Sequence, residues 1–365
     1  MNPGETMIVY GSEYSYFTGK FEAYLRYKEI SYVRRPLGVS MYSWKLPRLL
    51  GGAQLPTVQL PDGRWMTDTT PMIAWLEERH PEPAVIPADP VQRFAALLIE
   101  DFGDEWLWRA AMHYRWSFAE DRRLLSGRLT RELVRLPLPL PLRRRWFARR
   151  QRRLFVTGDG VDERTRPHVE AAYTRVLAML EPVFASRSFL LGERPSVADF
   201  GLFGPMFRHF ALDPTPARIM RNRAPGTYEW VARLWNARAS RIGDRPLAGG
   251  VPSDLEPLLT EAGETHLPML AANAAAHAAG RKTYEFTVQG VTYRSVPTSR
   301  YRVWALARLR GAYLALGAGD VAAVDDLLGR TGCLEPLLRA EALDSGHDPE
   351  GVAPFSGVLR MVRDG

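Results

Sequence analysis

The stretch that most limits the possible folds of this chain runs from residue 54 to residue 80, QLPTVQLPDGRWMTDTTPMIAWLEERH. Apolar residues alternate as in a strand, Pro-Asp-Gly makes a typical hairpin turn, and a second short strand can return. Pro56 cannot donate to a sheet, so it belongs at a strand beginning, an edge or a cis turn. Asp68, Thr69 and Thr70 supply capping oxygens for a helix with an apolar face. The stretch therefore predicts a ββα unit.

This order of a Leu-Pro strand, a hairpin, an acid-hydroxyl pair and an apolar helix resembles the glutathione-binding half of the thioredoxin-like domain of glutathione S-transferases. In that family the proline is cis, and the residue before it hydrogen-bonds the cysteinyl part of glutathione through its backbone; Pro56 and Leu55 stand at these positions here. The family's acid-serine pair, which holds the γ-glutamyl end, corresponds to Asp68 and Thr69. A carboxylate can pair with the ligand's ammonium, and a hydroxyl at a helix N-terminus can hold its carboxylate. Helix capping alone would also explain Asp68 and Thr69.

The turn at residues 12–20 follows a short apolar strand and precedes a predicted helix. In the family this turn carries the Tyr, Ser or Cys that activates the thiol, and Ser15 stands at the position of the serine and cysteine types. A hydroxyl there can donate to a bound thiolate and lower a thiol pKa from its free value of about 8.5. Tyr14 is the neighbouring alternative, because Tyr16 replaces the proline that commonly follows the catalytic position. Ser15 could also be an ordinary N-cap.

The predicted order of elements over residues 1–80 is βαβαββα, which fits an α/β thioredoxin-like domain that binds glutathione. In such a domain the topology brings Ser15, Leu55 and Asp68 to one crevice, as the resemblance implies. Residues 81–90 contain four prolines and are expected to be a linker.

Residues 91–245 are predicted to form an all-α domain like the C-terminal domain of the same family. Its first stretch, residues 91–120, is helical and rich in aromatic residues. The resemblance implies that this stretch lines the site for an apolar co-substrate, with Trp108, Tyr114 and Trp116 as pocket candidates. An aromatic stripe at helical spacing is nonetheless more often core.

A second phrase in this domain, FLLGERPSVADF at residues 189–200, is similar to the family's Phe-Leu-x-Gly-x-x-Pro-Ser/Thr-x-Ala-Asp. Ser196 and Asp199 have the spacing of a capping box in which Asp replaces the usual Glu or Gln. The phrase is structural in the family, because it fixes the start of a buried helix. No catalytic role is assigned to either residue.

The segment RLPLPLPLRRRWFARRQRR at residues 135–153 combines alternating Leu-Pro with seven arginines in its second part. The prolines exclude a regular helix in the first part, and the second part can be a helix with a basic face. Contact with nucleic acid, contact with a membrane surface, and a solvated or partner-facing surface all remain open. No recognised nucleic-acid motif accompanies the arginines.

Composition indicates a globular protein of two or three domains, with 46% hydrophobic and 24% charged residues among 365. No apolar run is long enough for a membrane span and no signal segment precedes Met7, so the expected location is cytoplasmic. The single cysteine, Cys333, excludes an internal disulfide and a multi-cysteine metal site. His113 has no second ligand at helical spacing, so no metal site is predicted.

The resemblance ends near residue 245, and residues 246–365 are predicted to be an α+β extension of unknown role. They contain no motif that indicates chemistry, and we expect their removal to leave a folded two-domain unit. They could cover the helical domain, make a dimer contact or bind a partner. The predicted elements are a helix at 269–279, a hairpin of strands at 283–288 and 291–296, and helices at 301–316 and 321–328.

The function implied by the resemblance is that of a glutathione-dependent transferase. Glutathione is the expected co-substrate, its thiol attacks a small apolar electrophile, and the protein is expected to be a homodimer. Conjugation, isomerisation, dehalogenation and ether cleavage all occur in the superfamily, and the sequence does not choose among them. The alternative is a non-catalytic protein of the same fold that acts in binding, because fold does not establish activity. Nucleic-acid binding ranks below both.

Overall fold

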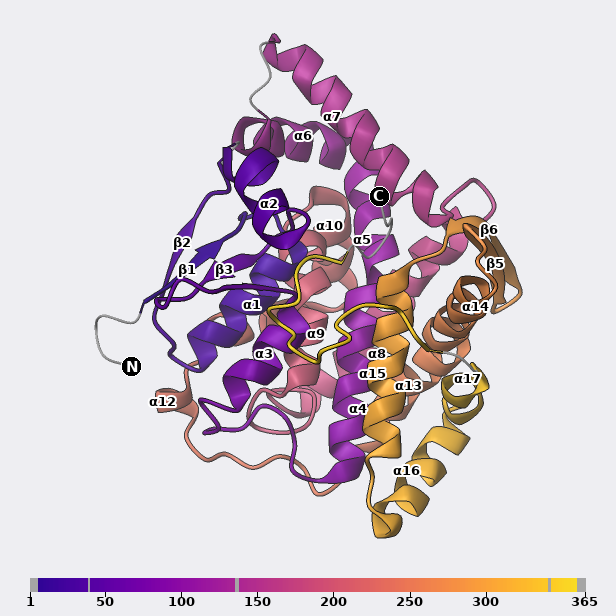
Figure 1. Cartoon of the computed structure of the whole chain (residues 1–365). Helices are drawn as coiled ribbons and strands as arrows, with labels where there is room; N and C mark the ends of the chain where they lie inside the picture. The colour runs from indigo at the N-terminus through magenta and orange to yellow at the C-terminus, as the bar shows by residue number, and fades with distance from the viewer. Residues whose placement is uncertain (1–5, 39, 135–137, 341–342, 360–365) are drawn as a thin grey trace.

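A four-stranded sheet forms the first part of the molecule in the computed structural model, which describes residues 6–38, 40–134, 138–340 and 343–359. The strands lie in the order β2-β1-β3-β4, with β1 parallel to β2 and the other neighbours antiparallel. The predicted thioredoxin-like βαβαββα order is confirmed (Figure 1). The elements are β1 (Met7–Tyr10), α1 (Tyr16–Tyr27), β2 (Tyr32–Arg35), the π-helical turn η1 (Met41–Lys45), α2 (Leu46–Leu50), β3 (Thr57–Gln59), β4 (Trp65–Thr67) and α3 (Thr69–Glu77).

The register of the sheet places three loops at the same end of the strands. Tyr10, the last residue of β1, pairs with Thr57, the first residue of β3, and Thr57 pairs with Thr67, the last residue of β4. The chain therefore enters or leaves the sheet beside this row in all three strands. The loop after β1, the loop before β3 and the start of α3 lie next to one another as a consequence.

The strand predicted from Leu55 is shorter in the structure, because β3 begins only at Thr57. The Leu55–Pro56 peptide is cis, as the resemblance implies. The predicted hairpin turn is confirmed, with Gly63 at a φ of 89° and a hydrogen bond from Leu60 N–H to the Arg64 carbonyl at 2.9 Å. A positive φ of this kind favours glycine, since it has no Cβ to clash.

A helical part follows the sheet, as predicted. The aromatic stretch that was predicted as one helical region is divided, because Phe118 is extended between two helices. Ser196 and Asp199 form the predicted capping box. The elements are α4 (Pro90–Asp101), η2 (Phe102–Trp106), α5 (Leu107–Ser117), α6 (Ala119–Leu133), α7 (Leu140–Phe155), η3 (Thr157–Asp159), α8 (Arg166–Ser186), α9 (Val197–Pro205), η4 (Met206–Phe210), α10 (Pro214–Arg223), α11 (Pro225–Trp235) and α12 (Ala239–Ile242).

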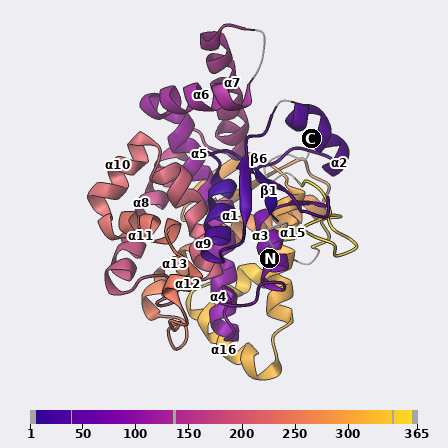
Figure 2. The ribbon, with the colours of Figure 1, turned by 90° about the vertical axis from the view of Figure 1, so that its left-hand side faces the viewer.

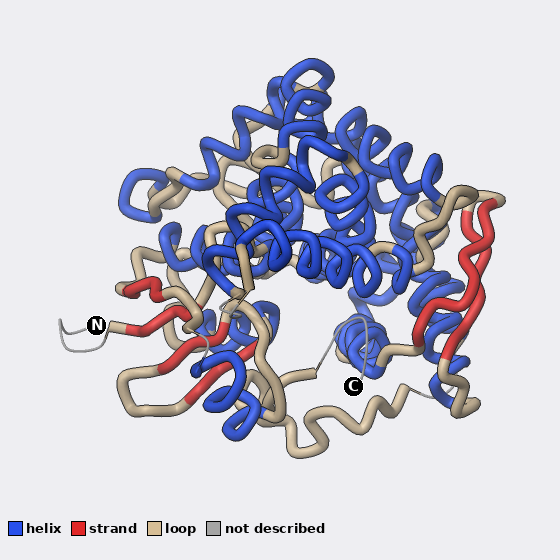
Figure 3. Tube along the Cα trace, turned by 90° about the horizontal axis from the view of Figure 1, so that it is seen from above, coloured by secondary structure: helices blue, strands red, loops and turns tan. Residues whose placement is uncertain are grey.

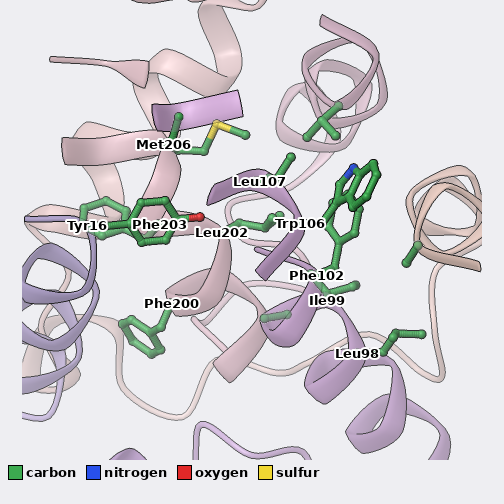
Figure 4. Close-up of a cluster of buried hydrophobic side chains, with 14 of the residues drawn as sticks. Tyr16, Leu98, Ile99, Phe102, Trp106, Leu107, Phe200, Leu202, Phe203 and Met206 are labelled. Carbon is green, nitrogen blue, oxygen red and sulfur yellow. The ribbon is translucent and has the colours of Figure 1, made fainter. Parts of the chain in front are cut away.

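Helix α9 lies at the centre of the molecule and packs closely against α4 (Figure 1). A Cβ atom added to Gly201 of α9 would lie 2.4 Å from the Cα of Glu100 in α4, so only glycine allows this approach. The larger apolar side chains point away from this contact, as Figure 4 shows: Phe200 and Phe203 of α9 lie on the side of α1, Leu98 lies on the far side of α4, and all three belong to the buried core. Gly201 therefore marks a close helix contact.

The C-terminal extension contains a two-stranded hairpin between helices, as the sequence predicts (Figure 3). Strand bounds agree with the prediction to within one residue. Two short helices, α13 and α17, were not predicted. The elements are η5 (Ser253–Leu255), α13 (Glu256–Glu261), η6 (Ala262–His266), α14 (Leu267–Ala278), β5 (Thr283–Val288), β6 (Val291–Pro297), α15 (Arg300–Leu314), α16 (Ala318–Arg330) and α17 (Leu334–Arg339).

The extension is joined to the helical part through buried charges. His266 lies 2.6 Å from Asp101 of α4. Arg302 of α15 pairs with Glu105 at 3.3 Å and with Asp159 at 3.0 Å, and all three side chains are buried. Apolar residues of both parts belong to one continuous core. These contacts argue against the expectation that residues 246–365 can be removed without loss of the fold.

The last described residues, 343–359, return to the sheet domain (Figure 1, yellow). We call this segment the tail. The carbonyl of Pro354 accepts from the N–H of Thr67 at 3.1 Å, and the N–H of Val358 donates to the carbonyl of Leu50 at 2.8 Å. The tail therefore connects the end of β4 to the end of α2.

Candidate functional site

Ser15 lies immediately before α1 and caps it. Its Oγ accepts from the N–H of Thr18 at 3.3 Å, and its side chain is half-buried. Within the ranges that the structure describes, no acceptor takes the hydroxyl hydrogen of Ser15. The hydroxyl can therefore cap the helix and still donate a hydrogen bond to a ligand.

Tyr14 belongs to a turn that is fixed to the helical part. The carbonyl of Tyr14 accepts from Nη1 of Arg115 at 2.7 Å, and the guanidinium of Arg128 lies 5.7 Å from the centre of the tyrosine ring. Arg115 is buried and makes a two-point ion pair with Asp213, at 2.8 and 3.0 Å. Burial raises the pKa of Asp213 to about 6, and Arg115 opposes that rise. The turn that holds Ser15 is thus positioned by α5.

The backbone of Leu55 is open for a ligand. Neither its N–H nor its C=O forms a hydrogen bond with any described residue, and the next residue is the cis Pro56. Leu55 is half-buried, and its side chain packs against a small cluster that includes Leu46 and Val358 of the tail. A free donor and a free acceptor on one residue, in the loop before β3, can hydrogen-bond an extended peptide.

Asp68 is the N-cap of α3, and Thr69 is the first residue of that helix. One oxygen of Asp68 accepts from the N–H of Thr70 at 3.3 Å, with Asp68 itself at a φ of 70°. The same oxygen accepts from the hydroxyl of Tyr301 in α15 at 3.2 Å. The Thr69 hydroxyl has no partner in the described part of the chain. The predicted cap is present, and the extension adds a tyrosine to it.

Burial makes the Asp68 carboxyl group harder to ionise. Burial raises the pKa of Asp68 to about 6, while Arg308, Lys20 and the hydrogen bonds from Thr70 and Tyr301 oppose the rise. A cation placed beside this carboxylate would lower its pKa again. Asp68 is therefore suited to hold an ammonium group.

A buried ionic cluster lies beneath the start of α3. Lys20 of α1 pairs with Glu100 at 2.6 Å and also with Asp104, and its Nζ donates to the Thr70 hydroxyl at 3.2 Å. That hydroxyl in turn donates to Glu100 at 2.7 Å. Burial raises the pKa of Asp104 to about 8, against the attraction of Lys20. The cluster ties α1, α3 and α4 together at the place where the loops of the sheet meet.

The aromatic candidates take different positions. Trp108 is half-buried, and its ring stacks on Phe17 in the first turn of α1 with centroids 5.8 Å apart. Phe155 meets Trp108 edge to face at 5.6 Å. Tyr114 and Trp116 are 2% and 1% exposed, packed among other rings of the helical core. Of the three candidates only Trp108 is partly exposed, and it contacts the first turn of the helix that follows Ser15.

Residues of the tail contact α3, the hairpin and the end of β4. Phe355 packs edge to face on Trp75 of α3, and the guanidinium of Arg64 lies 4.7 Å from the centre of the Phe355 ring. The carbonyl of Gly357 accepts from the Thr67 hydroxyl at 3.4 Å. Thr67 directly precedes Asp68, so the tail passes beside the loops that carry Leu55 and Asp68.

Sequence reasoning did not find Lys20, Tyr301 or the tail. Lys20 follows Ser15 on the same helix, but nothing local indicates that its charge is buried. Tyr301 lies 233 residues from Asp68 in the chain. No motif connects the extension with the sheet, so only the folded structure brings them together.

No group of three or more His, Cys, Asp or Glu residues that could hold a metal ion is found in the described ranges. None of the helices that the structure describes is both long and apolar enough to cross a membrane.

Comparisons with known proteins gave matches to two family models and to solved structures. The model of the glutathione S-transferase N-terminal domain matches residues 9–84, and the model of the glutathione S-transferase C-terminal domain matches residues 147–237. A search of curated proteins gave no significant match.

Similar solved structures include three bacterial proteins at low identity. A beta-etherase, LigF, from a Sphingobium species is 18% identical with a TM-score of 0.45, over 63% of this chain and 94% of that chain. A glutathione S-transferase-like protein from Pseudomonas syringae is 19% identical with a TM-score of 0.43, over 68% and 77%. A glutathione S-transferase from Methylobacterium radiotolerans, in complex with glutathione sulfonate, is 19% identical with a TM-score of 0.41, over 68% and 98%.

Proposed function

Because the chain belongs to the glutathione S-transferase superfamily, we propose that it binds glutathione at Leu55, Asp68 and Thr69 and activates the thiol with Ser15. The observation that carries the proposal is the open backbone of Leu55 before the cis Pro56. This residue offers one donor and one acceptor to the cysteinyl unit of the tripeptide. Pro56 keeps the loop in the shape that presents them.

In this proposal, Asp68 and Thr69 bind the two charged groups of the γ-glutamyl unit. Asp68 offers a carboxylate to the ammonium of the γ-glutamyl group, and its second oxygen has no partner among the described residues. Thr69 offers its hydroxyl and its own N–H, at the N-terminus of α3, to the carboxylate of the same group, because the Thr70 N–H is bonded to Asp68 and Pro71 has none. Charge-assisted hydrogen bonds of this kind are roughly twice as strong as neutral ones.

Glutathione supplies the thiol that attacks the electrophile. Ser15 donates its free hydroxyl hydrogen toward the sulfur, which favours the thiolate and lowers the thiol pKa. Trp108 and Phe17 offer an apolar wall beside Ser15 for a small apolar electrophile. The protein's part is orientation and adjustment of the pKa, since the nucleophile comes with the ligand.

Calorimetric titration with glutathione tests the binding step. We expect Asp68→Ala to weaken binding at least tenfold, as roughly 1.5–3 kcal/mol for a hydrogen bond to a charged group implies. Asp62→Ala is the matched control, because Asp62 is an exposed carboxylate in the adjacent hairpin. If Asp68→Ala lowers only thermal stability and leaves affinity unchanged, Asp68 is a cap and the proposed ligand role is wrong.

The contacts of Asp68 with α15 favour a second candidate, a binding protein without catalysis. Tyr301 already donates to the carboxylate that would hold the ammonium. In this alternative, glutathione or a related metabolite binds but its thiol is not activated. Ultraviolet titration of the bound thiolate, followed by assay with a generic aryl electrophile, separates the two. A bound thiol with an unshifted pKa and no turnover would favour the non-catalytic protein.

A further inference from the structure

The outer face of α7 carries four exposed arginines, Arg145, Arg149, Arg152 and Arg153, and we call this set the α7 arginine face. The helix contains no acidic residue. No carboxylate in the described ranges forms an ion pair with any of the four. The face is therefore a local concentration of uncompensated positive charge.

Several other exposed arginines of the chain are paired with carboxylates. Arg164 lies 2.8 Å from Asp162, Arg330 lies 3.0 Å from Glu256, and Arg339 lies 2.7 Å from Glu335. The arginines on the inner side of α7 are also partnered, because Arg143 donates to the Val134 carbonyl and Arg144 to the Arg123 carbonyl. The inner arginines therefore fix the helix to the rest of the chain, and the four outer arginines do not.

Exposed apolar side chains lie among these charges. Leu142 and Trp146 are 54% and 49% exposed, one helical turn apart on the same outer side as the arginines. Leu138, just before the helix, is 46% exposed. On the opposite side Phe147 packs edge to face on Trp116, with centroids 5.8 Å apart. The helix is thus anchored by one side and leaves an apolar stripe within a basic face on the other.

Helix α7 also lies at the periphery of the molecule. Figure 1 shows it projecting beyond α6 at the top, and Figure 2 shows the same helix at the extreme of the molecule after a quarter turn. A flat partner can approach this end without meeting the sheet domain or the hairpin.

We propose that α7 docks on an anionic lipid surface. Arginines bind the phosphate groups of the lipids, while Leu142 and Trp146 enter the boundary between headgroups and acyl chains. A nucleic acid would engage the same arginines but would leave the leucine and tryptophan stripe in water. The combination of unpaired arginines with exposed apolar residues therefore favours lipid over nucleic acid.

Cosedimentation of the full chain with vesicles tests the proposal. We expect binding to vesicles of phosphatidylcholine with about 30% phosphatidylserine and not to phosphatidylcholine alone, with a steep loss at high salt. The variant R145Q/R149Q/R152Q/R153Q should lose about fivefold in partition coefficient for each arginine removed. Trp146→Ala should weaken binding without changing its dependence on salt.

The matched control removes the same number of charges elsewhere. R223Q/R241Q/R245Q/R281Q changes four exposed arginines outside α7 and should retain vesicle binding to within a few fold. An equal loss in both quadruple variants would show that total charge, not α7, drives binding, and would overturn the proposal. Binding of wild type to duplex DNA or RNA without binding to phosphatidylserine vesicles would overturn it as well. Circular dichroism of each variant confirms that the fold is kept.

Discussion

Ser15 uses one oxygen for two tasks, which sets the design of its test. Ser15→Ala removes the cap on Thr18 and should cost about 0.5–2 kcal/mol of stability. It should also raise the pKa of enzyme-bound glutathione, because the hydrogen bond to the thiolate is lost. Ser15→Thr keeps the hydroxyl and should keep both properties. Ultraviolet titration of the bound thiolate against pH measures the effect.

Tyr14→Phe is the comparison that decides between the two neighbours. If Ser15 is the donor, this variant should leave the thiol pKa close to that of wild type. The opposite pattern, with a large effect for Tyr14→Phe and none for Ser15→Ala, would assign thiol activation to the phenol. An unshifted thiol pKa in wild type would contradict both assignments.

Asp68 gives a prediction for the pH dependence of binding. Its pKa is raised to about 6, and only the ionised carboxylate attracts the ligand's ammonium. Affinity should therefore be full above about pH 6 and should fall by up to roughly tenfold per pH unit below it. S-methylglutathione is the suitable ligand, because it has no thiol to titrate. Calorimetry from about pH 5 to pH 8 measures the profile, and Asp68→Asn should bind weakly with a flat one.

At the scale of elements, Lys20 joins three helices through one ammonium group. Lys20→Met would leave Glu100 and Asp104 buried without their cation, so we expect a loss of about 3–5 kcal/mol in unfolding free energy. The triple variant K20M/E100Q/D104N removes the uncompensated charges and should recover much of the loss. Urea denaturation measures all three proteins. A single variant as stable as wild type would show that the cluster contributes little.

The elements near the site could be predicted from the sequence because their signals are local. The hairpin glycine, the cis proline position and the capping box each depend on a few neighbouring residues. The hairpin at β5 and β6 was also found from alternation and a Gln-Gly turn. The exact start of β3 was not predicted, because Leu55 and Pro56 precede the first residue that pairs with β1 and β4.

The parts that escaped prediction depend on contacts between distant segments. Tyr301 reaches Asp68 from α15, and Pro354 reaches Thr67 from the tail. Neither contact has a periodic or compositional signal, because a tyrosine on a helix and a proline in a loop are ordinary residues there. The burial of Lys20 could not be predicted for the same reason, since its two carboxylate partners belong to another domain.

At the scale of the whole molecule, the extension completes the core of the helical part. Removal of residues 246–365 would leave Asp159 and Glu105 without Arg302 and would expose Trp106, which packs against Tyr293. We therefore expect residues 1–245 alone to lack a cooperative thermal transition and near-ultraviolet circular dichroism. The full chain is the control. A sharp melt of the truncated chain would instead support an independent two-domain unit.

The tail is a part of the same chain that lies against the sheet domain beside Leu55 and Asp68. A group tethered to its own binding site has a local concentration set by the connecting chain, so dilution of the protein does not release it. A free ligand that needs the space beside Thr67, or the Asp68 oxygen to which Tyr301 donates, must displace these contacts. Its apparent affinity is the intrinsic affinity multiplied by the fraction of molecules in which the tail and Tyr301 have moved away.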